Sequence, residues 1–322
     1  MPLNVKHCIN AGFLGRQGDR FFQYQPDASL ADKLRIAARI PDLDGIELKY
    51  PADLSDLAET KRLLREFGLT VAVVNINLKG PIKWRYGSLT SVDPQIRADA
   101  VRDLKLSMDI AADLGAALVT CCPVADGHDY PFEMDYSAAW DRFIEGVHTA
   151  AAYRPEVKLS LEYQPNDPVV RILLRDAGRA LYCCLATGLP NVGVTLDIGH
   201  SLAAGETPAE AVCLLAREKR LFYVHTDDNT RDGDWDLLSG TVNFWHFLET
   251  LYHLERVGYE GWMSADIFAR RVDPLEGFST NLLLIKRMLA FLHKLDSAKI
   301  EAMFQQERNA CDVFEYLTRF LA

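Results

Sequence analysis

The hydrophobic positions of the chain follow two alternating patterns. Longer stretches, such as residues 97–115 and 141–153, place apolar residues three and four positions apart, as in a helix with one buried face. Between such stretches lie short runs rich in apolar and β-branched residues, which are typical of buried strands. The predicted strands lie within Val5–Leu14, Asp44–Tyr50, Thr70–Leu78, Ala116–Pro123, Val157–Pro165, Val192–His200, Leu221–Asp228 and Gly261–Phe268.

Strands that alternate with helices pair in parallel and carry the helices on the outside. Eight such units predict an α/β protein, a closed (β/α)8 TIM barrel. A doubly wound open sheet is the alternative, but no G-x-G-x-x-G motif follows the first predicted strand. Gly68, Gly115 and the turn at 188–191 lie where the preceding helices should end.

Three segments depart from this simple repeat. Residues 79–94 and 124–137 are long connections between a strand and a helix, and long ordered connections are often functional. Residues 295–322 follow the eighth unit and have an amphipathic helical pattern. We therefore expect a barrel domain at residues 1–294 and a C-terminal helical extension at 295–322, packed on the barrel or on a neighbouring subunit.

Composition and charge narrow the function. The chain has 322 residues, 49% of them hydrophobic, and a net charge of −10. An acidic protein is a poor partner for nucleic acid or for an anionic membrane surface, so we expect neither. The start of the sequence has no secretory signal pattern, and the seven cysteines form no C-x-x-C motif. A cytoplasmic location is expected, with buried cysteines rather than a thiol nucleophile at Cys121 or Cys122.

Polar residues stand at the ends of the predicted strands, where barrel enzymes carry their active sites. Glu47, Asn75 and Asn77 end the second and third strands. The last four strands end with Glu162, Asp197, His225 and Asp266. Three carboxylates converging on one axial site would repel one another unless a cation offset their charge. The pattern therefore predicts a metal site at these four residues.

A second cation site is expected beside the first. The segment YVHTDDNTRDGDWD, residues 223–236, collects five aspartates after the seventh strand. Asp234 and Asp236 share one side of the chain in extended geometry, and His200 follows Asp197 by three residues. We assign these three residues to the second site and expect Asp227, Asp228 and Asp232 to be solvated or to cap loop backbone. The oxygen-rich ligand set favours Mn²⁺, with Mg²⁺, Co²⁺ or Zn²⁺ as alternatives.

Several motifs in this order resemble a known family. LEYQP, LDIGH, HTDDNTRDGDWD and ADIFARRVDP resemble the xylose-isomerase-like TIM barrels. Two further segments, YGSLTSVDPQIRADAVRDLKLSMDIAADLGA and ADGHDYP, resemble the metal-dependent rhamnose isomerases. The similarity covers residues 75–274.

The resemblance implies an enzyme that interconverts a free aldose and a ketose by a hydride shift between C1 and C2. It implies one cation that orients the sugar hydroxyls and a second that polarises the carbonyl. Related isomerases have a lysine two residues after the strand-five glutamate, where this chain has Gln164. The predicted catalytic residues are Glu162, Asp266, His128 and Asp234, and the predicted substrate-binding residues are Asn75, Trp84, Gln164 and His200.

Two of these residues have alternative interpretations. His128 is either a proton-handling residue or a hydrogen-bonding residue that orders its loop. Trp84 either forms an apolar wall for the sugar or anchors its long connection.

Other functions stay open at this point. A ketose 3-epimerase would use Glu162 and Asp266 as an acid–base pair on opposite faces of the sugar. A sugar-binding or metal-binding barrel without catalysis is a further alternative, which the absent lysine supports. An endonuclease would need a basic groove, and the net charge argues against it. The expected partner is a monosaccharide, and a homodimer or homotetramer is the expected assembly.

Overall fold

Eight parallel strands close into a barrel in a computed structural model, which describes residues 3–18, 21–307 and 309–320. The strands hydrogen-bond in the order β1-β13-β12-β11-β8-β6-β5-β4 and back to β1. The open-sheet alternative is therefore wrong, and each of the eight predicted runs contains one barrel strand. These strands are β1 (Lys6–Asn10), β4 (Gly45–Tyr50), β5 (Val71–Ile76), β6 (Leu118–Cys121), β8 (Lys158–Glu162), β11 (Val192–Asp197), β12 (Leu221–Thr226) and β13 (Trp262–Ala265).

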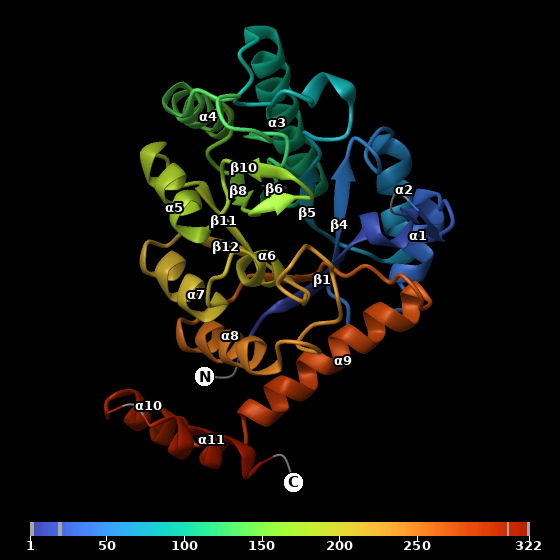
Figure 1. Ribbon diagram of the computed structural model, residues 1–322. Coiled ribbons are helices and arrows are strands. Elements are labelled where there is room, and N and C mark those ends of the chain that lie inside the picture. The colour runs from blue at the N-terminus through green and yellow to red at the C-terminus, as the bar shows by residue number, and fades with distance from the viewer. Residues whose placement is uncertain (1–2, 19–20, 308, 321–322) are drawn as a thin grey trace.

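Helices surround the barrel as a ring (Figure 1). In parallel topology the chain must cross back to the other end of the barrel after each strand, and a helix that covers the sheet makes that crossing. The helices are α1 (Leu30–Ala37), α2 (Leu57–Phe67), α3 (Pro94–Leu114), α4 (Tyr136–Ala151), α5 (Ala177–Ala186), α6 (Ile198–Ala203), α7 (Pro208–Arg217), α8 (Phe244–Arg256), α9 (Pro274–Leu292), α10 (Ser297–Phe304) and α11 (Ala310–Thr318).

Helix α3 shows how the sequence defines an element. The Asp93 side chain accepts a hydrogen bond from the Gln95 backbone N–H, and Pro94 follows at the first helical position, where no N–H is needed. Gly115 ends the helix with a φ of +75°, in the left-handed region that favours glycine. Between these caps, Leu104 and Met108 are buried four positions apart and face the sheet. The predicted helix ends at Gly68 and Gly115 are confirmed.

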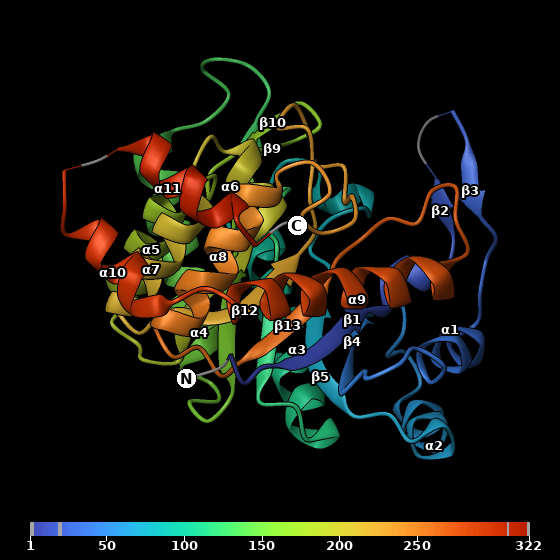
Figure 2. The same ribbon diagram turned by 90° about the horizontal axis from the view of Figure 1, so that it is seen from below.

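The connections between the main elements contain short strands. Two small sheets contain β2 (Gln17–Gly18), β3 (Gln23–Gln25), β7 (Gly127–His128), β9 (Asn166–Asp167) and β10 (Val170–Ile172). Strand β10 lies between β7 and β9, so it joins the connection after β6 to the connection after β8. These two connections therefore form one structure at the carboxyl end of the barrel (Figure 2).

A buried carboxylate fastens the connection after β5 to the connection after β6. Asp126 is fully buried and accepts hydrogen bonds from the backbone N–H and the hydroxyl of both Ser88 and Thr90. The backbone donors lie at 2.8 Å and 2.7 Å. Four donors on one carboxylate hold the two long predicted connections together.

We expect Asp126→Ala to destabilise the protein by about 3 kcal/mol or more, because it leaves several buried donors without acceptors. Urea unfolding followed by circular dichroism measures this change as a lower midpoint. Asp129→Ala, at an exposed position in the same connection, is the matched control. Equal midpoints for the two variants would contradict the anchoring role.

The C-terminal helices lie against α8. Phe314 of α11 packs edge-on against Trp245 at 5.3 Å between ring centroids, and Glu301 of α10 accepts a 2.8 Å hydrogen bond from the Tyr252 hydroxyl. In Figure 2 the two helices lie beside the ring of barrel helices. The division into a barrel at 1–294 and an extension at 295–322 stays a prediction, and both ranges include residues outside the described part of the chain.

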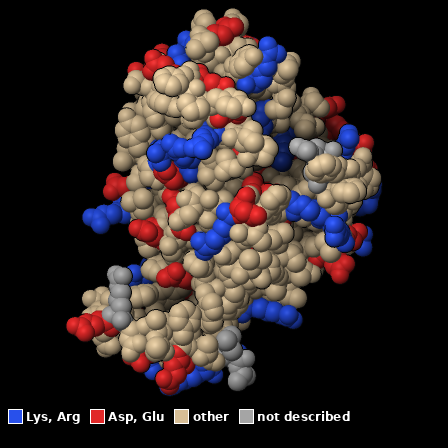
Figure 3. All heavy atoms as spheres, viewed as in Figure 1, with Lys and Arg blue, Asp and Glu red and all other residues tan. Residues whose placement is uncertain are grey.

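In the described residues, no helix combines the length and the apolarity needed to cross a membrane. On the face seen in Figure 3, lysine and arginine side chains are interspersed with aspartate and glutamate. This face therefore lacks the continuous basic surface that nucleic acid binding requires.

Candidate metal centre

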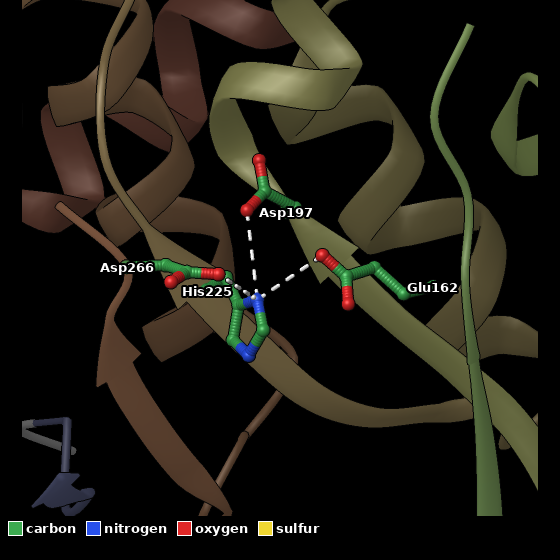
Figure 4. Close-up of side chains that lie close together, drawn as sticks. All are labelled: Glu162, Asp197, His225 and Asp266. Atoms are coloured by element: carbon green, nitrogen blue, oxygen red, sulfur yellow. Dashed lines mark ion pairs between the residues drawn. The ribbon is translucent and has the colours of Figure 1, made fainter. Parts of the chain in front are cut away.

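Four strand ends bring together the first predicted ligand set. Glu162 and Asp197 end β8 and β11, His225 lies near the end of β12, and Asp266 follows β13. The Nδ1 atom of His225 lies 3.0 Å from Asp266 Oδ2, 3.3 Å from Glu162 Oε1 and 3.6 Å from Asp197 Oδ2 (Figure 4). Strand register produces this convergence, since Asp197 is paired directly with His225 across the β11–β12 ladder.

Glu47 fixes the orientation of the His225 ring. Its carboxylate is fully buried at the end of the barrel, 3.1 Å from His225 Nε2. The Tyr223 hydroxyl donates to the same carboxylate at 2.5 Å, and the Asn75 amide donates at 2.6 Å. With Nε2 held by Glu47, Nδ1 faces the three carboxylates. A partner of this kind is what orients a metal-binding histidine in known sites.

The ionisation of this cluster is strongly coupled. Burial opposes the charged form of Asp197, but the charges of His200 and His225 outweigh it and lower the Asp197 pKa to about 2. Burial likewise opposes a charged His225, yet the charges of Glu162, Asp266 and Glu47 raise its pKa well above the usual value. A positive charge between the carboxylates therefore stabilises the cluster, and the protonated His225 ring provides one such charge.

The four residues fit a divalent cation. Their ligand atoms all lie within 4.8 Å of one another. Ligands bound to one ion at about 2.1 Å lie roughly 3 to 4.3 Å apart, so only a small contraction is needed. Over the described ranges, His225 Nδ1 and His200 Nδ1 are buried without a hydrogen-bond partner. Three carboxylates and one imidazole form a donor set suited to Mn²⁺, Mg²⁺ or Zn²⁺.

A second acidic cluster lies beside the first. Ligand oxygens of Asp227, Asp234 and Asp236 lie within 4.8 Å of one another. His200 Nε2 lies 3.1 Å from Asp234 Oδ2, while its Nδ1 lies 3.4 Å from Glu162 Oε1. The His200 ring thus stands between the two clusters. The predicted grouping of His200, Asp234 and Asp236 is found in the structure.

Asp227 is not solvated, so that alternative of the prediction is wrong, and the backbone that it caps belongs to α6 rather than to its own loop. Its carboxylate is fully buried, and its Oδ1 accepts a 2.8 Å hydrogen bond from the Gly199 N–H. Burial and the charges of Asp197, Asp236 and Asp234 raise its pKa well above the usual value. The Asp227 carboxylate occupies the space beside Gly199, where a Cβ would lie only 1.9 Å from Asp227 Oδ2. The glycine of the LDIGH motif therefore makes room for this carboxylate.

Asp228 and Asp232 behave largely as predicted. Asp228 is buried and accepts hydrogen bonds from the backbone N–H of Val242 and Asn243, so it caps loop backbone. Asp232 is exposed and accepts from the Trp235 indole.

The loop reaches this arrangement with a left-handed backbone at Asp236 rather than with a fully extended segment. Asp236 has a φ of +47°, which is uncommon for a residue other than glycine. Its carbonyl accepts a 2.8 Å hydrogen bond from Phe268 N, which ties the turn to the segment after β13. The expectation of extended geometry at 234–236 was wrong, although both carboxylates do converge. Burial together with the charge of Asp234 raises the Asp236 pKa well above the usual value.

A cavity of about 100 Å³ opens on both clusters. Its size exceeds the roughly 10–15 Å³ that one water needs and falls below the roughly 300 Å³ of a typical drug site. A small polar ligand fits such a space. The lining residues are Asn10, Phe13, Lys49, Asn75, Ile76, Asn77, Lys79, Cys122, Glu162, Gln164, His200, Asp234, Asp236 and Asp266.

Three of the four predicted substrate-binding residues line this cavity. Asn75 and His200 are among them, together with Gln164, which is buried and donates a 2.9 Å hydrogen bond from Nε2 to Asp234 Oδ2. Asn75 and Asn77 both face the cavity, as residues two positions apart in a strand can.

Of the predicted catalytic and substrate-binding residues, two are not brought into this cavity. Trp84 is 2% exposed and belongs to the hydrophobic core, with the Lys83 ammonium 4.0 Å from its ring centroid. Its position therefore matches the interpretation as an anchor of the connection after β5. His128 lies on β7, where its ring packs edge-on against Tyr136 at 5.3 Å. Its role in proton transfer stays a prediction.

Sequence reasoning missed other residues of the site. Asn10 ends β1 and donates a 3.0 Å hydrogen bond to Asp266 Oδ1, a strand-end signal that was visible in the sequence. Lys49 and Lys79 line the cavity, but nothing in their local pattern distinguishes them from surface lysines. Cys122 also lines it, and burial raises its pKa well above the usual value. The thiol therefore stays protonated, in agreement with the rejection of a thiol nucleophile.

Cation binding is expected to release protons. In the metal-free protein the His225 pKa is raised, so the ring stays protonated at pH 7 and must lose a proton before Nδ1 can bind a cation. Cation affinity should therefore rise with pH until the raised pKa of His225 is reached. The contribution of His225 to folding stability changes with pH in the opposite direction. The stabilisation from the charged ring is complete below about pH 6.5 and is lost as pH rises through the raised pKa.

Calorimetric titration of the metal-free protein with Mn²⁺ in two buffers of different ionisation enthalpy measures this proton release. We expect an apparent enthalpy that depends on the buffer, equivalent to about one proton or more at pH 7. The same enthalpy in both buffers would show that the ring is already neutral.

A protein-family model described as xylose isomerase-like TIM barrel matches residues 34–294. Among curated proteins, a xylose isomerase of Thermus thermophilus is 29% identical over 245 residues, which are 72% of this chain and 63% of that protein. A xylose isomerase of Thermus caldophilus is 28% identical over 261 residues, which are 77% of this chain and 67% of that protein. The chain thus spans slightly less than two thirds of the length of the first relative.

Solved structures share the fold. A D-tagatose 3-epimerase-like protein superposes with a TM-score of 0.70 at 20% identity, covering 90% of this chain and 99% of that one. A D-allulose 3-epimerase from Methylomonas sp. gives 0.67 at 20% identity, covering 89% and 98%. Similarity at this identity concerns the barrel alone.

Proposed function

The chain belongs to the xylose isomerase-like TIM barrel family, and from this premise we propose that it is an enzyme that interconverts a free aldose and a ketose with a divalent cation. The name of its curated relatives supports an isomerisation of this kind. The sugar is proposed only as a monosaccharide, whose hydroxyl and carbonyl groups match the polar side chains that line the small cavity.

One observation carries the proposal: two acidic clusters meet in a single cavity. Glu162, Asp197, His225 and Asp266 form one cluster, and Asp227, Asp234 and Asp236 form the other. A single structural cation would need only the first. The second cluster supports a chemistry in which charge develops on two neighbouring oxygens of the substrate.

The reaction converts the aldehyde at C1 to an alcohol and the alcohol at C2 to a ketone. The C2–H bond breaks and a C1–H bond forms with the same electron pair, while the proton of O2 ends on O1. Divalent cations at the two clusters would supply Lewis-acid polarisation of these oxygens when bound.

The residues of the chain hold and orient the reacting groups. Glu162 and Asp266 line the cavity and belong to the first cluster, so they are assigned to the sugar hydroxyls. Asp234 has one oxygen fixed by His200 and Gln164, while its Oδ1 is buried and has no hydrogen-bond partner among the described residues. We assign Asp234 to the proton that moves between O2 and O1. Asn75 is held by Glu47 and completes the wall.

Chelation tests the metal requirement. Treatment with EDTA followed by gel filtration should abolish sugar interconversion, and Mn²⁺ should restore it. Mg²⁺, Co²⁺ and Zn²⁺ are compared with Mn²⁺ to identify the preferred cation. Activity that survives complete removal of metal would contradict the proposal.

A ketose 3-epimerase is the second candidate. Glu162 and Asp266 reach the same cavity from β8 and from the segment after β13, on opposite sides of His225. Two carboxylates on opposite faces of a sugar carbon could remove and return a proton at C3. Exchange of solvent deuterium into C3 of a ketose distinguishes this reaction from the isomerisation.

The proposal extends to the cation, the location and the assembly. We favour Mn²⁺ as the cation, because oxygen ligands predominate and no thiolate takes part. A cytoplasmic location and a homodimer or homotetramer are proposed as well. A barrel that binds sugar without catalysis predicts a tightly bound sugar recovered unchanged.

A further inference from the structure

The ammonium group of Lys79 is a positive charge in the cavity to which the proposed function assigns no role. Lys79 follows β5 and lines the cavity with Glu162, Gln164 and Asp234. Among the residues that the structure describes, no side chain forms an ion pair or a hydrogen bond with its ammonium. A half-buried charge without a fixed partner is available to a ligand.

The backbone around Lys79 is fixed although its side-chain end is not. The Lys79 N–H donates a 2.9 Å hydrogen bond to Asn77 Oδ1, and Gly80 follows in the left-handed region with a φ of +89°. This turn directs the chain away from β5 while it leaves the Lys79 side chain on the cavity wall.

The second lysine of the cavity is held differently. The Lys49 ammonium lies 4.9 Å from the centroid of the Phe13 ring, and the side chain packs so closely on Gly12 that a Cβ there would lie 2.4 Å from Lys49 Cε. Its charge acts on Asp266 in the first cluster. The charge of Lys79 instead interacts with Glu162 of the first cluster and Asp234 of the second.

Lys79 stays charged at neutral pH. Burial opposes the ammonium form, but the negative charges of the Glu162, Asp167 and Asp234 carboxylates favour it and raise the Lys79 pKa. Gln164 cannot replace this charge, because an amide carries none and one of its N–H groups is already bound to Asp234.

We propose that Lys79 is a catalytic residue whose ammonium donates a hydrogen bond to the carbonyl oxygen of the substrate and stabilises the negative charge that develops there. The inference rests on the proposed aldose–ketose interconversion. Lys79 transfers no proton in this step, since the proton that leaves O2 is the one that ends on O1. A donor already in place stabilises such charge at little cost of reorganisation.

The test compares Lys79→Met with Lys79→Arg, which keeps the charge, and with Lys83→Met as the matched control in the same connection. Lys83 packs on the buried Trp84 and lies outside the cavity. We expect Lys79→Met to lower kcat by about 100- to 1,000-fold, Lys79→Arg to restore part of the rate, and Lys83→Met to behave as wild type. Cation stoichiometry from calorimetry should be the same in all four proteins.

Binding gives a readout independent of turnover. An aldonohydroxamate carries negative charge where the carbonyl oxygen lies, whereas an alditol of equal length is neutral. Lys79→Met should weaken the hydroxamate about tenfold or more and leave alditol binding within about twofold.

The outcomes separate the two proposals. Wild-type activity together with a kcat for Lys79→Met within threefold of wild type would overturn the assignment of Lys79 and leave the proposed function intact. Equal weakening of hydroxamate and alditol would also overturn it, because a packing role affects both. A wild-type protein that converts no sugar would contradict the proposed function itself. Lys79→Gln, measured in the same way, replaces Lys79→Met if that variant does not fold.

Discussion

Glu162→Gln is expected to abolish sugar interconversion, with a loss of about a thousandfold or more. Glu162 Oε1 lies 3.3 Å from His225 Nδ1 and 3.4 Å from His200 Nδ1, so one oxygen contacts His225 of the first cluster and the His200 ring between the two clusters. Glutamine keeps the shape and removes the charge. The variant should therefore lose one charged cation ligand, and the rings of His225 and His200 should lose a contact that orients them. The electrostatic stabilisation that a bound cation gives to a transition state is worth several kcal/mol.

Glu206→Gln is the control for this substitution. Glu206 is a half-buried carboxylate that accepts hydrogen bonds from the Tyr163 hydroxyl, the Ser201 hydroxyl and the Ala177 N–H, outside both clusters. Its loss should lower the unfolding midpoint but leave cation binding and kcat close to wild type. Initial rates and calorimetric cation affinity are measured for both variants. Wild-type cation affinity in Glu162→Gln would exclude Glu162 from the ligand set.

The double variant Asp234→Asn with Asp236→Asn is expected to lose isomerisation while one cation stays bound. The two carboxylates belong to the second cluster only, whereas the four residues of the first cluster remain. Neutral amides bind hard cations more weakly than carboxylates, so the second cluster should no longer compete for its ion. The proton relay assigned to Asp234 is removed by the same change.

Asp232→Asn provides the matched control because Asp232 is an exposed aspartate of the same loop. Bound metal is counted by inductively coupled plasma spectrometry after dialysis, alongside sugar conversion. If the double variant binds two ions per chain but is inactive, the second ion does not depend on Asp234 and Asp236 for binding. Full activity in the double variant would exclude a two-cation mechanism.

The barrel and its first cluster could be predicted because both depend on local patterns. Each strand is a short buried run, and the closing order follows once eight parallel strands alternate with helices. Parallel strands also place their carboxyl ends at one edge. Glu162, Asp197, His225 and Asp266 therefore had to converge, whatever the details of the loops.

The second cluster could be predicted only in part, since its geometry depends on long-range contacts. Asp227 looked like a loop residue, but its burial follows from the space that Gly199 leaves, 28 residues earlier in the chain. The left-handed conformation of Asp236 depends on a hydrogen bond with Phe268. No periodicity in the sequence encodes such pairings.

Glu47 and Lys79 show two further limits. Glu47 was visible at a strand end, but its partner is a histidine on β12, reached through the closed barrel. Lys79 lies in a connection whose path depends on the Asp126 anchor and on the core position of Trp84. Strand periodicity predicts which strand residues face the barrel axis. It does not predict which loop residues fold back over the end of the barrel.

The most direct test of the central claim is proton NMR of the Mn²⁺-loaded enzyme reaction in D₂O, recorded after the metal has been removed. A panel of pentoses, hexoses and deoxyhexoses serves as substrate. A hydride shift keeps the migrating hydrogen on carbon, so the proposed function predicts aldose–ketose conversion with little deuterium at C1 or C2. Deuterium at C3 of a ketose, without aldose formation, would contradict the isomerase and establish the epimerase in its place.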